Sequence, residues 1–241
     1  MTTIDVSSPA VLAAKQDVAD ATRILAREKL IGPFGHPSVR IQGTNLVAIL
    51  GDTHFAVKLL TEVGPEDVAI IDMDGVPLNP SICGPGERFI HTEIYQARPD
   101  VNAVVHAHPA YCIAFSVSDR PLQPLWHLCT EVSQGVPVHM KSIQIDTPEL
   151  AADLAATLGN RPFVLLHGHG SVAVGESMAT ACVRQISLER AAKLQSTVDA
   201  MGGSVPIAAD EIKPDDGLSV GLTQEEINAQ WDYWRLEISR H

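Results

Sequence analysis

The spacing of apolar residues along the chain predicts five long helices. Between residues 9 and 30, Val11, Ala14 and Val18 recur at intervals of three and four, which places them on one face of a helix. Gly32-Pro33 then stops this pattern, as expected for residues that end helices. A short helix is also expected after Pro109. The long predicted helices cover residues 9–30, 87–98, 147–158, 176–201 and 225–240.

Short apolar runs between these helices predict strands. Residues 46–50 follow the turn signal Gly43-Thr44-Asn45, so we expect a hairpin with the strand that precedes it. Strands and helices show no regular repeat, and neither a dinucleotide-binding glycine fingerprint nor a phosphate-binding loop occurs. We therefore expect an α/β layered domain with a mixed sheet. The other predicted strands cover residues 68–72, 103–108, 163–170 and, at an edge, 136–140.

Two segments have no clear period. Residues 118–136 are irregular and contain Trp126-His127. A long loop of this kind is often functional, and a subunit contact is the alternative. Residues 204–222 are rich in turn formers and acidic residues.

Composition narrows the possible partners and the compartment. The 241 residues suit one large domain, and the net charge of −12 argues against nucleic acid or an anionic membrane as partner. No apolar run approaches a membrane span, and residues 1–5 do not begin a signal peptide. The four cysteines form no CxxC pair, so we expect reduced thiols and a cytoplasmic location.

Two pairs of histidines follow buried apolar runs. His106-Ala107-His108 ends the predicted strand 103–108, and residues i and i+2 of a strand point to the same face. A second pair, His167-Gly168-His169, follows another apolar run. A single histidine in such a place is usually an ordinary core or surface residue. Two such pairs favour a divalent transition metal such as zinc.

A carboxylate stands at the start of a predicted helix. Glu87 follows Gly84-Pro85-Gly86 and shares a helix face with His91, four residues on. It can act as a metal ligand, as a general base, or as each in turn. The glycine- and proline-rich turn around His36 either presents His36 to a ligand or is simply a loop.

Three segments resemble the class II aldolase/adducin family. They are Glu87–His91, Ala97–His108 (which includes Arg-Pro-Asp-Val-Asn-Ala-Val-Val-His-Ala-His) and Leu165–Gly170, and the resemblance extends over roughly residues 10–200. It implies one three-layer α/β/α domain with a mostly antiparallel central sheet, spanning residues 1–241. Residues 204–241 would form a C-terminal extension that packs on the domain or on a neighbouring subunit. Assembly as a homo-oligomer, with a tetramer favoured, is also implied.

The resemblance also implies a metal site. Its ligands would be His106, His108 and His169, with His167 a less suitable ligand, and Glu87 would be the catalytic acid/base. Zn²⁺ is the expected ion, with Mn²⁺, Fe²⁺, Co²⁺ and Mg²⁺ as alternatives. The loop at residues 35–40 would line the substrate pocket.

The chain departs from the sugar-phosphate members of this family at the phosphate site. Those members carry two serines before the glutamate, where this chain has Pro85 and Gly86, which lack hydroxyls. They also tend to have Gly-Asn where this chain has Gly35-His36. We therefore expect a non-phosphorylated small-molecule carboxylic acid as substrate.

Several residues could contact such a carboxylate. Arg88 could bind both of its oxygens or could make a structural ion pair instead. A neighbouring subunit could contribute two of the candidates, His127 and Tyr233. Tyr233 lies close to two tryptophans in the sequence and could equally pack on the domain. The candidate substrate contacts are His36, Arg88, His91, His127 and Tyr233.

These observations predict a metal-dependent carbon–carbon lyase. The expected reaction is decarboxylation of a non-phosphorylated, hydroxylated carboxylic acid, with an aromatic acid as one option. The missing phosphate-site serines favour it, and the segment Glu87–His91 resembles the dihydroxyphthalate-decarboxylase-like branch. The first alternative is an aldolase that acts on a hydroxy-oxo acid or a sugar-derived substrate. The second is a non-catalytic adducin-like binding domain, and the presence of Glu87 with all three histidines counts against it.

Overall fold

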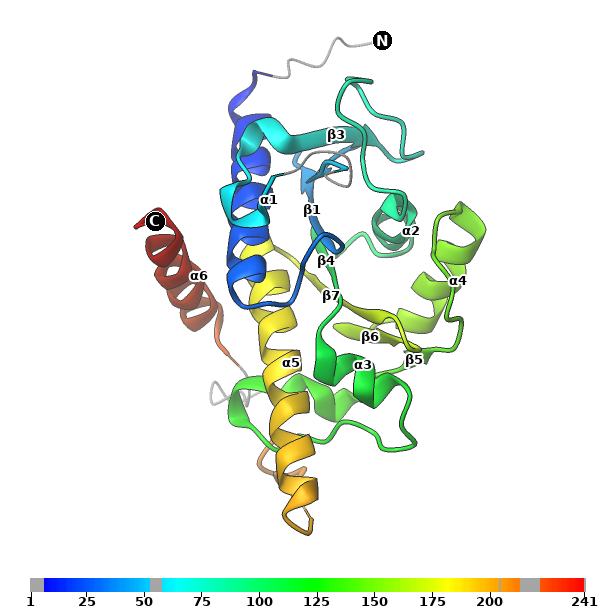
Figure 1. Ribbon diagram of the computed structural model, residues 1–241, viewed down its shortest axis with the longest axis vertical. Coiled ribbons are helices and arrows are strands. Elements are labelled where there is room, and N and C mark those ends of the chain that lie inside the picture. Colours follow the sequence, from blue (N-terminus) through cyan, green and yellow to red (C-terminus); the bar gives the residue numbers. More distant parts are fainter. Residues whose placement is uncertain (1–6, 53–57, 204, 213–221, 241) are drawn as a thin grey trace.

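The fold is built on one seven-stranded sheet (Figure 1). The computed structural model describes residues 7–52, 58–203, 205–212 and 222–240. The strands follow the order β3-β2-β1-β4-β7-β6-β5, and all neighbours are antiparallel except β5 and β6, which are parallel. The strands are β1 (His36–Ile41), β2 (Leu46–Leu50), β3 (Val68–Asp72), β4 (Ala103–Ala107), β5 (Val138–His139), β6 (Phe163–Leu166) and β7 (Gly170–Gly175).

Helices cover both faces of the sheet. Figure 1 shows α1 and α5 on one side and α2 and α4 on the other. Short 3-10 turns η1 (Leu60–Glu62) and η2 (Pro65–Asp67) precede β3, and η3 (His127–Gln134) lies in the segment predicted to be irregular. The helices are α1 (Pro9–Arg27), α2 (Arg88–Ala97), α3 (Ala110–Ser116), α4 (Pro148–Leu158), α5 (Met178–Ala200) and α6 (Gln224–Ser239).

The alternation of side chains along β4 separates the two halves of the core. Ala103, Val105 and Ala107 pack with apolar residues of α1 and α5, whereas Val104 packs with α2 and α4. His106 is two residues beyond Val104 and therefore faces the α2 side of the sheet. The expected fold, a single α/β domain with a mostly antiparallel sheet flanked by helices, is confirmed.

One predicted strand proves to be the start of a hairpin. Residues 163–170 were expected to form one strand, but β6 ends at Leu166 and β7 begins at Gly170. Between them Gly168 has a φ of 63°, and the His169 N–H donates to the Leu166 carbonyl at 3.0 Å. Glycine adopts that φ without a steric penalty, so the chain reverses here. His169 consequently lies in a tight turn.

The C-terminal helix packs on its own domain. Trp231 and Trp234 are buried against the cluster formed by α1 and α5, and the Arg235 guanidinium lies 2.8 Å from the buried carboxylate of Asp20 in α1. Tyr233 lies outside this contact and is exposed. Part of the acidic segment 204–222 lies outside the described residues. Over the described ranges, no helix combines the length and apolar character that crossing a bilayer requires.

Candidate metal centre

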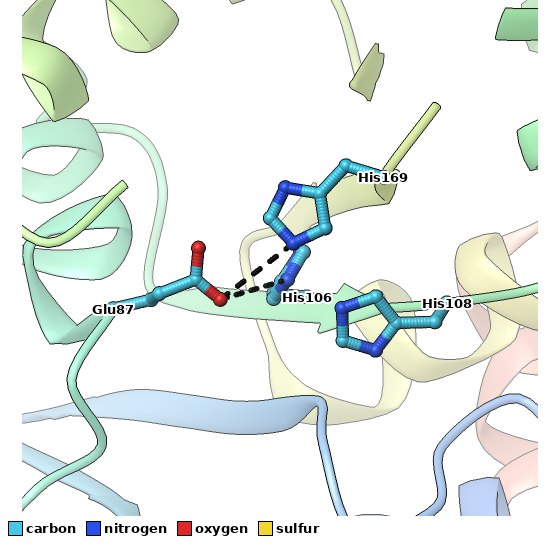
Figure 2. Close-up of side chains that lie close together, drawn as sticks. All are labelled: Glu87, His106, His108 and His169. Carbon is cyan, nitrogen blue, oxygen red and sulfur yellow. Dashed lines mark ion pairs between the residues drawn. The ribbon is translucent and has the colours of Figure 1, made fainter. Parts of the chain in front are cut away.

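Four side chains from three separate segments converge beside the end of β4 (Figure 2). His106 lies in β4, His108 just beyond its end, His169 in the β6–β7 turn and Glu87 immediately before α2. One ligand atom from each residue lies within 4.8 Å of the others. Figure 2 shows the three imidazoles and the carboxylate directed toward a shared space.

His106 is oriented to offer a lone pair to a metal. Its Nδ1 lies 3.1 Å from the backbone carbonyl of Ser171 in β7. A carbonyl only accepts, so Nδ1 carries the hydrogen and Nε2 is left with its lone pair. This Nε2 is buried and has no hydrogen-bond partner within the described part of the chain. A buried acceptor without a partner is costly, and a divalent cation would remove that cost.

The Glu87 carboxylate uses its two oxygens differently. Oε1 accepts a hydrogen bond from the Ile145 N–H at 2.8 Å. Oε2 lies 3.6 Å from Nε2 of His106 and 3.7 Å from Nε2 of His169, which is too long for a hydrogen bond. These distances leave room for a bound ion between oxygen and nitrogen, because metal–ligand bonds are about 2 Å long.

The electrostatics of the cluster also suit a cation. Burial alone would raise the pKa of Glu87, but the His106 and His169 rings and the Ile145 N–H outweigh burial and lower it to about 2. Burial, with smaller contributions from His106 and His169, lowers the pKa of His108 to about 3. At neutral pH the cluster therefore presents a carboxylate and a neutral imidazole, the forms that bind metals.

A cavity of about 390 Å³ opens beside the cluster. Phe34 and Ile143, both largely exposed, lie on its walls, and Phe34 makes an edge-to-face contact with the His108 ring. A side chain at position 35 would collide with Ile31, since a Cβ there would lie 2.6 Å from it. The cavity is lined by Pro33, Phe34, Gly35, His36, Leu50, Gly51, Asp52, Pro85, Gly86, Glu87, His108, Ser142, Ile143, Gln144, Gly168 and His169.

Of the five candidate substrate contacts, one lies at this cavity. His36 lines it. His91 is fully buried behind His36, with Nε2 2.7 Å from His36 Nδ1, so it supports the wall rather than reaching a ligand. The Arg88 guanidinium donates to the Gly75 carbonyl at 2.8 Å and stacks on the Phe89 ring. Arg88 thus holds the loop before α2 and is not placed at the cavity.

The other two candidates lie away from the cavity of their own chain. His127 is exposed at the start of η3, and the Tyr233 hydroxyl donates to Glu237 within α6 at 2.9 Å. Their contribution to a neighbouring subunit's site stays a prediction. The Nδ1 atom of His167 lies 2.7 Å from the Ser142 hydroxyl, so its ring points to the segment after β5.

Sequence reasoning missed the segment that follows β5. Ser142 and Gln144 line the cavity, and Ile145 supplies the N–H that holds Glu87. The run Lys141-Ser142-Ile143-Gln144 contains no recognisable motif. A main-chain N–H is common to almost every residue, so no sequence signal marks Ile145.

Burial of His91 predicts that the protein loses stability in acid. Burial, and secondarily the His106 ring, lowers the pKa of His91 to about 3, whereas an unfolded histidine has a pKa of about 6.5. Between these values the unfolded chain binds a proton that the folded chain does not. The free energy of unfolding should therefore be full above pH 6.5 and fall toward pH 3, by at most about 1.4 kcal/mol per pH unit for this residue.

Urea unfolding of the metal-free protein at several pH values between 7 and 4.5 measures this loss. The His91→Gln variant should show a shallower pH dependence than the wild type. His127→Gln, which changes an exposed histidine, is the matched control and should keep the wild-type slope. Equal slopes in all three proteins would contradict the prediction.

A family model, named relatives and a solved structure all relate this chain to the class II aldolases. The family described as "Class II Aldolase and Adducin N-terminal domain" matches residues 16–196. A 3,4-dihydroxyphthalate decarboxylase of Arthrobacter keyseri is 32% identical over 238 residues, covering 94% of this chain and 93% of its own. An L-fuculose phosphate aldolase of Escherichia coli O6:H1 is 31% identical over 180 residues, with 75% and 80% covered. The crystal structure of an aldolase II superfamily protein from Pseudomonas syringae superposes with a TM-score of 0.80 at 23% identity, covering 97% of this chain and 94% of that one.

Proposed function

The chain belongs to the class II aldolase and adducin family, and on that premise we propose that it is a zinc-dependent decarboxylase of a hydroxylated aromatic carboxylic acid. The observation that carries this proposal is the wall next to the metal cluster. Pro85 and Gly86 line the cavity immediately before Glu87. Neither has a hydroxyl, and proline has no N–H, so this wall offers little to a phosphate group.

The similarity to named relatives supports the same class of substrate. The relative that matches over 94% of the chain is a decarboxylase of a dihydroxyphthalate, which is a non-phosphorylated aromatic acid with two neighbouring hydroxyls. Phe34, Ile143 and Pro33 supply apolar walls to the cavity, and such walls suit a flat ring. We therefore propose a dihydroxylated benzoic or phthalic acid as the substrate class.

His106, His108 and His169 would hold the metal, with Oε2 of Glu87 facing two of them. Three imidazoles and a carboxylate are a donor set that zinc accepts. When bound, such an ion supplies a Lewis acid that stabilises negative charge developing on the substrate.

Glu87 is placed to carry the proton that decarboxylation requires. Loss of CO₂ leaves an electron pair on a ring carbon, and that carbon must take up one proton. Because the pKa of Glu87 is lowered to about 2, its carboxyl group is ionised in the resting protein and has lone pairs that can accept a proton. We propose that Oε2 first takes a proton from a substrate hydroxyl and then delivers it to the carbon, as a general base and then a general acid. The Ile145 N–H keeps Oε1 in place during both transfers.

The test is CO₂ release by the purified, zinc-loaded protein. We expect release from 3,4-dihydroxyphthalate and none from phthalate, which lacks the hydroxyls. Aldehyde formation from a hydroxy-oxo acid or from L-fuculose phosphate, without CO₂ release, would favour the aldolase alternative. The 31% identity to the L-fuculose phosphate aldolase supports this alternative. Bound metal with neither activity would indicate a non-catalytic domain. The proposed homotetramer is checked separately by light scattering of the same preparation.

A further inference from the structure

Four buried polar side chains form a hydrogen-bonded chain that leads from the cavity into the domain. His36 Nδ1 lies 2.7 Å from His91 Nε2, and His91 Nδ1 lies 2.6 Å from the Ser38 hydroxyl. The Ser38 hydroxyl in turn lies 2.7 Å from the Tyr95 hydroxyl. Of these four, His36 borders the cavity, while the other three are at most 1% exposed. Strand β1 supplies two members and helix α2 the other two.

These four side chains carry more polar hydrogens than there are hydrogen bonds between them. Both imidazoles are buried and neither bonds to a carboxylate, so both are neutral, because burial disfavours the charged form. A neutral histidine, a serine and a tyrosine each bring one hydrogen on nitrogen or oxygen. Four hydrogens therefore serve three links, and one of them must point elsewhere.

The surplus hydrogen belongs on the member that faces the cavity. On Tyr95 or Ser38 it would be a buried donor without an acceptor. Among the described residues the Tyr95 hydroxyl also bonds to the Val104 backbone N–H, which can only donate, and the Ser38 hydroxyl bonds to His91 and Tyr95 alone. An unsatisfied buried donor is costly. His36 Nε2 is also unbonded over the described ranges, yet it is not a fully enclosed atom, so a ligand or water can accept from it. The Tyr95 hydroxyl must then donate to Ser38, the Ser38 hydroxyl to His91 Nδ1, and the His91 Nε2–H to His36 Nδ1.

We propose that this series of hydrogen bonds fixes His36 as the Nε2–H tautomer and that this N–H donates to the carboxylate of the substrate. The identity of the acceptor rests on the proposed function. His36 pairs with His106 across β1 and β4, and their ring centres are 5.2 Å apart. The donor therefore stands beside the metal cluster, and it could accommodate a carboxylate next to a ring hydroxyl that faces this cluster. Ser38, His91 and Tyr95 are positioning residues that act through His36.

Nitrogen NMR of the zinc-loaded protein labelled with ¹⁵N-histidine tests the tautomer directly. The ring signals of His36 and His91 are those lost in His36→Gln and His91→Gln. We expect hydrogen on Nε2 and none on Nδ1 in both residues. Hydrogen on Nδ1 of either residue would overturn the proposal, whether or not the protein releases CO₂, so this failure is distinct from failure of the proposed function.

Two ligands and two variants test the acceptor. Adding 2,3-dihydroxybenzoate, whose carboxylate is next to a hydroxyl, should move the His36 Nε2–H proton downfield, whereas catechol, which has no carboxylate, should not. Equal responses to both ligands, or no response to either, would overturn the contact. His36→Leu, which has no donor, should weaken binding of 2,3-dihydroxybenzoate at least tenfold. His36→Gln, which keeps an N–H donor, should recover most of that loss, and equal weakening in both variants would count against a donor role.

Discussion

His106→Ala is expected to lower the metal content of the purified protein from about one ion per chain to nearly zero. His106 is the most deeply buried ligand, and its Nε2 has no partner other than the proposed ion within the described residues. Its hydrogen bond to the Ser171 carbonyl fixes the lone pair on Nε2. His106→Ala removes one of the three histidines proposed to hold the ion and replaces it with a methyl group that cannot bind metal. Elemental analysis after dialysis against trace zinc measures the result.

A matched control separates metal loss from damage to the fold. His139 in β5 is also buried, at 2% exposure against 0% for His106, and its Nε2 also lacks a partner among the described residues, but it lies outside the ligand cluster. His139→Ala should therefore keep its metal while suffering a similar loss of packing. If His106→Ala fails to fold, His169→Ala replaces it, because His169 lies in a turn and is less buried. Full metal content in either ligand variant would refute the assignment.

Glu87→Gln is expected to keep the metal but to slow turnover by roughly a hundredfold to ten-thousandfold, the usual range for loss of a general acid–base. The amide oxygen of glutamine can still accept from the Ile145 N–H, so the side chain should keep its position. The amide cannot take a proton from a hydroxyl and return it to carbon. The rate of CO₂ release and the metal content of the same preparation measure both effects.

Glu93→Gln is the control for this experiment. Glu93 lies in the same helix, α2, and its carboxylate bonds to Gln96, away from the cluster. Its turnover should equal that of the wild type. Turnover near normal in Glu87→Gln would remove Glu87 from proton transfer. Loss of metal in that variant would instead show that Glu87 serves mainly as a ligand.

Features that depend on local periodicity could be predicted from the sequence. The alternation of a strand places His106 and His108 on one face without reference to any other part of the chain. The apolar spacing of residues 9–30 likewise located α1, although the helix ends at Arg27, because Lys29 adopts a φ of 61°. The family motif added the layered architecture, which the structure shares.

Features that depend on strand register or on main-chain groups could not be predicted. No sequence pattern shows that β1 pairs with β4 so that His36 lies opposite His106. Arg88 has the right chemistry for a carboxylate, but its bond to the Gly75 carbonyl is visible only in the folded chain. The turn that carries His169 was mistaken for the end of a strand, because apolar residues alone do not show where a hairpin reverses.

The separation of the ligands along the chain couples metal binding to folding. Glu87, the pair at the end of β4 and His169 come together only when α2, β4 and the β6–β7 turn have assembled. The unfolded chain therefore has no comparable site, and every bound ion favours the folded state by mass action. At free metal one hundred times the dissociation constant, this linkage adds about 2.7 kcal/mol to the free energy of unfolding. Metal supply would then govern how much folded protein persists as well as how much of it is active.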